Sequence, residues 1–200
     1  MNIKNIPAYC INLDQRTDRW KEAQKQFKEL ELNVKRFSAV HMAPGWKGCR
    51  QSHIDLLMIL KNEPYFIIFE DDIVILPYFF EIIEKALQQM PDNWKILFLG
   101  ANLQQPIQLI SENVAQLKNA FCTHAMLFNN TTGFVNQIIE QADSIRKIDI
   151  FYRDHIQEPG NAYITNPMIA TQADSYSDIT RAEQKYNKLM IENFYKNLIR

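Results

Sequence analysis

Apolar residues in this chain gather in short runs, separated by amphipathic segments. The clearest run is 65–69, in which aromatic and β-branched residues follow one another without a polar break. Such a run is typical of a strand that is buried on both faces of a sheet. Shorter runs of the same kind predict further strands at 8–13, 34–40, 94–99 and 120–128.

The segments between these runs carry apolar residues at helical spacing. Trp20, Ala23, Phe27 and Leu30 recur at intervals of three, four and three residues, on one face of a helix opened by Thr17. The same criterion predicts helices at 52–60, with Ser52 as its N-terminal cap, and at 79–90, 132–142 and 179–198. Residues 101–118 have no clear period and predict a loop with one short element. Alternating strands and helices indicate an α/β sheet covered on both faces.

Length and charge narrow the class of protein. The 200 residues contain no internal repeat or linker, so we expect a single domain over 1–200. A net charge of −1 argues against a nucleic-acid-binding protein. The glycines form neither GxGxxG nor GxxxxGK[ST], which excludes a dinucleotide fingerprint and a P-loop.

Cysteine usage and hydropathy bear on location. The three cysteines are widely spaced and form no CxxC pair, which favours a reducing compartment. No apolar run is long enough to span a membrane, and the first residues do not resemble a signal peptide, so we expect a cytoplasmic protein. The basic, amphipathic segment 179–198 is expected to dock on its own domain, and peripheral contact with an anionic membrane is the alternative.

Three consecutive carboxylates, Glu70, Asp71 and Asp72, follow the buried strand 65–69. In open α/β sheets, ligands bind at this end of the strands. Because side chains alternate along an extended backbone, Glu70 and Asp72 can converge while Asp71 points away. Converging carboxylates suit Mn²⁺ or Mg²⁺, and a solvated acidic turn is the alternative. The apolar segments on both sides favour the metal, since clustered like charges need a counterion.

Three motifs follow one another along the chain: YCINLDQRTDR at 9–19, GCRQSH at 48–53 and EDD at 70–72. In this order they resemble glycosyltransferase family 25, which includes lipopolysaccharide and collagen galactosyltransferases. The resemblance implies a GT-A-like fold, with a mixed, mainly parallel sheet and a DXD-like metal motif. It also implies a nucleotide-sugar donor, UDP-galactose or UDP-glucose, a glycan or glycoprotein acceptor, and inversion at the anomeric carbon.

The resemblance also assigns roles to individual residues. Glu70 and Asp72 become the metal ligands, and the donor-binding residues become Asn12, Leu13, Arg16, Arg19, His53 and Asp71. The planar guanidinium groups of Arg16 and Arg19 suit phosphate oxygens. A surface charge network with the neighbouring aspartates is the alternative for both arginines. The segment 172–178 is implied to close the site near the diphosphate.

An inverting transfer needs a general base that deprotonates the acceptor hydroxyl. Asp149, which stands between Ile148 and Ile150, is our choice because an apolar setting suits such a base. A helix-capping role for Asp149 is the alternative, and the other candidate bases are His124, Asp154 and His155. Two different functions compete with the transferase: an inactive nucleotide-sugar-binding module and a nucleotidyltransferase. The missing glycine-rich phosphate loop counts against the latter.

Overall fold

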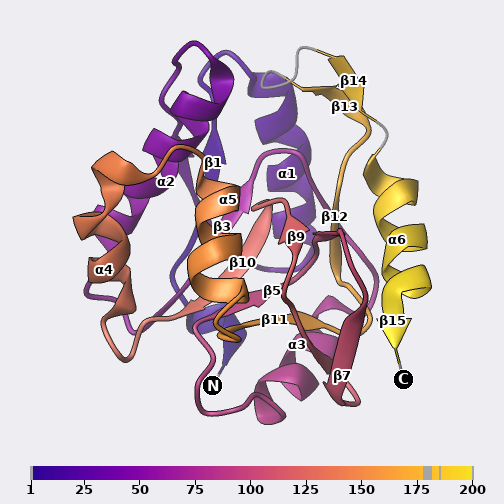
Figure 1. Ribbon diagram of the computed structural model, residues 1–200. Coiled ribbons are helices and arrows are strands. Elements are labelled where there is room, and N and C mark those ends of the chain that lie inside the picture. Colours follow the sequence, from indigo (N-terminus) through magenta and orange to yellow (C-terminus); the bar gives the residue numbers. More distant parts are fainter. Residues whose placement is uncertain (1, 178–181, 185, 200) are drawn as a thin grey trace.

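The computed structural model describes residues 2–177, 182–184 and 186–199 and shows a sheet with helices on both faces (Figure 1). The strands of the main sheet are β1 Ala8–Asn12, β2 Val34–Ser38, β3 Tyr65–Glu70, β5 Ile96–Phe98, β7 Ile107–Ser111, β8 Val114–Gln116, β10 Ala125–Asn129, β11 Ala162–Thr165 and β15 Leu198–Ile199. The α-helices are α1 Thr17–Glu29, α2 Gly45–Leu60, α3 Phe79–Gln88, α4 Phe134–Glu140, α5 Ile148–Tyr152 and α6 Tyr186–Asn197.

The described residues also form three small sheets of two strands each. They pair β4 Ile73–Ile75 with β12 Ala170–Gln172, β6 Asn102–Leu103 with β9 Ala120–Phe121, and β13 Ser175–Ser177 with β14 Ala182–Gln184. Short turns of helix lie at η1 Ile3–Asn5, η2 Ala142–Ser144 and η3 Arg153–Gln157, the last with π-helical geometry.

Within the described ranges, the main sheet has nine strands in the order β15-β7-β8-β11-β5-β10-β3-β1-β2. β1 pairs in parallel with both β2 and β3, and β11 pairs in parallel with β5. β10 is antiparallel to β3 and β5, and β8 is antiparallel to β7 and β11. β15 is parallel to β7, so seven of these nine described strands run in one direction and only β8 and β10 are reversed. The sheet is therefore mixed and mainly parallel, which confirms the expected α/β, GT-A-like class.

Side chains of β3 alternate between two hydrophobic cores. Phe66 and Ile68 pack with α2, α4, α5 and α6 on one face, while Ile67 and Phe69 pack with α1 and α3 on the other. All four side chains are fully buried. The uninterrupted apolar run at 65–69 therefore reflects burial of β3 on both faces of the sheet. The carboxylates follow directly at the carboxyl end of this strand.

The second helix begins earlier than predicted. α2 starts at Gly45, so Ser52 lies in its interior and the predicted cap is wrong. The Ser52 hydroxyl donates to the Gly48 carbonyl at 2.7 Å and accepts from the Val40 backbone N–H at 2.8 Å. A Cβ on Gly48 would clash with the Val40 carbonyl oxygen. Gly48 is a weak helix former, so the sequence did not indicate that the helix begins before it. In the structure, its missing side chain lets the 39–44 loop pack closely against α2.

Three other segments have a different secondary structure from the one predicted. Residues 101–118 form strands β6, β7 and β8 rather than a loop, and two of these join the main sheet. The predicted strand 120–128 is divided into β9 and β10 at Cys122, whose φ is 82°. Within the predicted helix 179–198, residues 182–184 form strand β14 and the helix begins at Tyr186, while 178–181 and 185 lie outside the described residues.

Candidate active site

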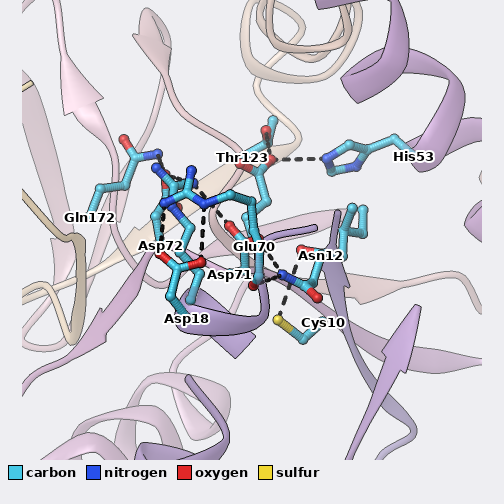
Figure 2. A network of polar contacts seen from close by, with 12 residues as sticks. Cys10, Asn12, Asp18, His53, Glu70, Asp71, Asp72, Thr123 and Gln172 are labelled. Atoms are coloured by element: carbon cyan, nitrogen blue, oxygen red, sulfur yellow. Dashed lines mark hydrogen bonds and ion pairs between the residues drawn. The ribbon is translucent and has the colours of Figure 1, made fainter. Parts of the chain in front are cut away.

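The carboxylates lie where several strands end at one edge of the sheet. Ile11 of β1 is the register partner of Glu70, so Asn12 lies beside the acidic residues. β12 pairs with β4 and places Gln172 opposite Ile73. Figure 2 shows the three carboxylates between His53 on one side and Gln172 on the other. This is the ligand-binding edge of an open α/β sheet.

Glu70 is held by donors from α2 and from the segment before β10. His53 Nε2 lies 3.1 Å from Glu70 Oε1, and Thr123 Oγ1 donates to the same oxygen at 2.5 Å. The His53 side chain is fully buried. Burial by itself would raise the pKa of Glu70, but the contacts with His53 and Thr123 outweigh it and hold that pKa below its ordinary value. Glu70 is therefore a well-supported carboxylate.

Asp71 is held by β1 and α1. Asn12 Nδ2 donates to Asp71 Oδ2 at 2.6 Å, and Arg19 Nη1 donates to Oδ1 at 3.0 Å. Asn12 is itself held by Arg36, whose Nε donates to Asn12 Oδ1 at 2.7 Å. Burial raises the pKa of Asp71, and the contacts with Asn12 and Arg19 oppose that rise. This carboxylate thus links the acidic residues to the predicted donor-binding segment.

Asp72 has the poorest set of partners of the three carboxylates. Gln172 Nε2 donates to Asp72 Oδ2 at 3.2 Å, and Arg19 Nη1 lies 3.8 Å from the same oxygen. Asp72 Oδ1 is buried and has no hydrogen-bond partner among the described residues. Burial, and then the charge of Glu70, raise the pKa of Asp72 to about 7.

These residues fit a hard divalent cation. Carboxylate oxygens are the preferred ligands of Mg²⁺ and Mn²⁺, and a buried oxygen without a partner is the group that such an ion would satisfy. The repulsion between Glu70 and Asp72 would be relieved by the same charge. Arg19 lies near Asp72 Oδ2, but no hydrogen-bond donor among the described residues reaches Asp72 Oδ1.

Comparison with known families decides the class of the protein. The family model of glycosyltransferase family 25, described as a lipopolysaccharide biosynthesis protein, matches residues 40–156. This span exceeds half of the chain and includes His53, the three carboxylates and Asp149. The chain belongs to glycosyltransferase family 25. Membership gives this family 25 glycosyltransferase a sugar donor and a glycan acceptor. A search among curated proteins finds no match.

The helices add one fact about membranes. No helix in the described ranges is both long and apolar enough to cross a bilayer.

Four of the predicted donor contacts, Asn12, Leu13, Arg16 and Arg19, lie outside the matched span, whereas His53 and Asp71 lie within it. Arg16 Nη2 pairs with Asp18 Oδ2 at 3.1 Å, and the Arg16 backbone N–H donates to the Leu13 carbonyl at 2.9 Å. The Arg16–Asp18 pair belongs to the charge network considered as the alternative. Arg19 instead faces Asp71 and Asp72. Donor contact by Asn12, Leu13, Arg16 and Arg19 stays a prediction.

The proposed base, Asp149, lies in the first turn of α5. Its Oδ1 accepts the Ile150 backbone N–H at 2.9 Å, and the side chain is half-buried. Burial is the main cause that raises the pKa of Cys49 and Cys122, and the charge of Asp149 adds to it at both thiols. The catalytic role of Asp149 in this glycosyltransferase stays a prediction.

The other candidate bases have different surroundings. His124 is fully buried, and burial lowers its pKa to about 4, so its ring is neutral at physiological pH. Asp154 pairs with Arg153 at 2.7 Å, and the exposed His155 stacks on Phe151 with ring centroids 4.4 Å apart.

Sequence reasoning did not anticipate the contacts of Thr123 and Arg36. Thr123 reaches Glu70 because β10 runs antiparallel beside β3, with Ala125 opposite Phe69. Arg36 reaches Asn12 because β2 runs parallel to β1. Neither contact has a local sequence signal. Gln172 lies in the segment expected to close the site, and the end of that segment, Asp178, is outside the described residues.

Proposed function

We propose that this glycosyltransferase moves a hexose from UDP-galactose or UDP-glucose to a hydroxyl of a glycan or glycoprotein acceptor. The reaction inverts the anomeric carbon and depends on Mn²⁺ or Mg²⁺. The observation that carries the proposal is the buried, unpartnered Oδ1 of Asp72 beside Glu70 at the carboxyl end of β3. Family membership supports the transferase chemistry.

Asp72 and Glu70 would hold the ion. When bound, it would neutralise charge on the diphosphate leaving group. Arg19, 3.8 Å from Asp72, supplies a positive group at the same edge. Asn12 and Arg19 each donate a hydrogen bond to Asp71, which holds the segment that we expect to bind the donor beside the carboxylates.

Inversion in one displacement requires a base on the acceptor side. The acceptor oxygen forms a bond to the anomeric carbon as the bond to the diphosphate oxygen breaks, and the hydroxyl proton passes to the base. We assign this role to Asp149, which comes from α5 rather than from the β3 end. Base and metal ligands on separate elements allow the acceptor and the leaving group to occupy opposite sides of the sugar.

The test measures UDP release from a panel of UDP-sugars with Mn²⁺, with a chelator, and in the variant Asp72→Ala. Slow hydrolysis of the donor by water suffices, so no acceptor needs to be known. We expect metal-dependent release from one donor and a loss of at least about 100-fold in Asp72→Ala, since metal charge stabilisation is worth several kcal/mol. Asp92→Ala, which removes an exposed carboxylate in the turn before β5, is the matched control.

Other outcomes identify the competing functions. Metal-dependent UDP binding without release from any donor would indicate an inactive nucleotide-sugar-binding module. Release of pyrophosphate from a nucleoside triphosphate would indicate a nucleotidyltransferase. Failure to bind UDP at all would contradict the proposed donor.

A further inference from the structure

A second set of potential ligands lies on the α2 side of Glu70. Ligand atoms of Cys49, His53 and Glu70 all lie within 4.8 Å of one another. Cys49 and His53 are four residues apart on α2, so they share one helix face, and this face is turned to the end of β3. His53 is fully buried and Cys49 is half-buried.

The chemistry of this set differs from that of the Asp72 side. Sulfur, imidazole nitrogen and a single carboxylate are the ligands that Zn²⁺ takes in proteins, whereas Mg²⁺ and Mn²⁺ prefer oxygen. The 3.1 Å between His53 Nε2 and Glu70 Oε1 suits two ligands on one ion, each at about 2.0–2.2 Å. Three protein ligands also leave a fourth position for water.

The surroundings of His53 are compatible with coordination. Its Nδ1 is buried and has no hydrogen-bond partner among the described residues. In the metal-free protein Nε2 donates to Glu70, so zinc binding moves the ring proton to Nδ1 and frees the Nε2 lone pair for the ion. Cys49 packs at the margin of the core cluster as a free thiol. On binding, the thiol proton passes to solvent and a sulfur–zinc bond forms, without any change of oxidation state.

We propose that Cys49, His53 and Glu70 form a Zn²⁺ site that inhibits the glycosyltransferase. Glu70 belongs to both ligand sets. When Glu70 binds zinc together with Cys49 and His53, its negative charge is no longer available to an ion held by Asp72. Two dications at neighbouring positions also repel each other, and bound zinc therefore weakens the binding of Mn²⁺. Inhibition rests on the proposed function, whereas zinc binding does not.

Zinc binding is tested without activity. Zinc K-edge X-ray absorption of the wild-type protein with one equivalent of Zn²⁺ is expected to show a sulfur ligand at about 2.3 Å. Co²⁺ in the same protein is expected to give a thiolate-to-metal charge-transfer band that Zn²⁺ removes. A zinc shell of oxygen and nitrogen alone in the wild-type protein would overturn the proposal, whatever the variants do.

Variants locate the ligands. Cys49→Ala and His53→Gln are expected to lower zinc affinity by at least about 10–100-fold, by analogy with the loss of groups that support metal sites. Cys122→Ala, another half-buried free cysteine, is the matched control and should keep wild-type affinity. Cys49→Ser keeps the shape of the side chain with a smaller, harder atom in place of sulfur, and it replaces Cys49→Ala if the latter does not fold. A charge-transfer band that persists in the Cys49 variant would contradict the assignment.

Inhibition is measured as Mn²⁺-dependent UDP release at increasing Zn²⁺, relative to each variant's own rate without zinc. Half-inhibition of the wild-type protein is expected at a zinc concentration roughly tenfold below that of the Cys49 variant. Equal inhibition of both would overturn the regulatory part. If the wild-type protein releases no UDP, the proposed function fails, while the absorption result still decides the zinc site.

Discussion

The two ends of the acidic cluster differ in how far the fold satisfies them. The side chains of Glu70 and Asp72 have the same exposure, 18%, yet Glu70 accepts from His53 and Thr123 while Asp72 keeps one oxygen without a partner in the described residues. The pKa of Glu70 is lowered, and that of Asp72 is raised to about 7. Partners rather than exposure therefore create the difference. The unsatisfied position is where an external cation gains most.

The largest expected change in stability comes from removing the side chain of His53, which supports Glu70. His53→Ala should lower the free energy of unfolding by about 2–4 kcal/mol, because it opens a cavity and removes a hydrogen bond from a buried carboxylate. Chemical denaturation in a chelating buffer measures the change. His41→Ala, at an exposed histidine, is the control and should be neutral. Equal stability of both variants would mean that His53 does not support Glu70.

At Asp72, the other end of the acidic cluster, we expect a smaller change in stability, of opposite sign. Asp72→Asn should raise the free energy of unfolding of the metal-free protein at pH 8 by about 1–3 kcal/mol, because the amide carries no charge in the buried site. The folded pKa, about 7, lies above the ordinary value of 3.8, so the folded state binds more protons between these values. Wild-type stability attributable to this group is present below about pH 4 and is lost as pH rises to about 7.

Denaturation curves at pH 4 and pH 8 test this sign. The variant and the wild-type protein should coincide at pH 4 and separate at pH 8, and saturating Mn²⁺ at pH 8 should stabilise only the wild-type protein. Asp92→Asn serves as the control at an exposed carboxylate. A variant less stable than the wild-type protein at pH 8 without metal would show that Asp72 is already satisfied.

The smallest effect concerns the pH dependence of metal binding. Below the pKa of Asp72, about 7, the ion must displace a proton, so Mn²⁺ affinity should fall by up to about tenfold per pH unit. Above pH 8 it should level off. Calorimetric titrations at pH 6, 7 and 8, in buffers of different ionisation enthalpy, measure affinity and the protons released together. A constant affinity from pH 6 to pH 8 would place the ion away from Asp72.

The fold was predictable where its signals are local. The run at 65–69 and the spacing from Trp20 to Leu30 locate β3 and α1 to within a residue or two. The start of α2 was not predictable, because Gly45 and Gly48 are weak helix formers. β7 is only five residues long, and Ile110 places an apolar side chain on its exposed face, so the sequence does not show the alternation of a strand.

The site follows the same division. The carboxylates are contiguous and end a clear strand, so sequence reasoning could find them. Their partners are distant in the chain: Thr123 is 53 residues from Glu70, and Gln172 is 100 residues from Asp72. Such contacts depend on strand order and register, which the apolar pattern alone does not encode. The satisfied and unsatisfied ends of the cluster could therefore be distinguished only in the folded chain.

The pairing of β12 with β4 has a consequence for protein synthesis. Gln172 reaches Asp72 from β12, and the backbone N–H of Ala173 donates to the Asp72 carbonyl at 2.7 Å. Translation delivers the carboxylates to the exit tunnel long before these residues, while Thr123 emerges about midway between them. On the ribosome, the Glu70 end of the cluster can form first and the Asp72 end last. A nascent chain that stalls before residue 170 therefore displays the acidic residues without a complete Asp72 environment.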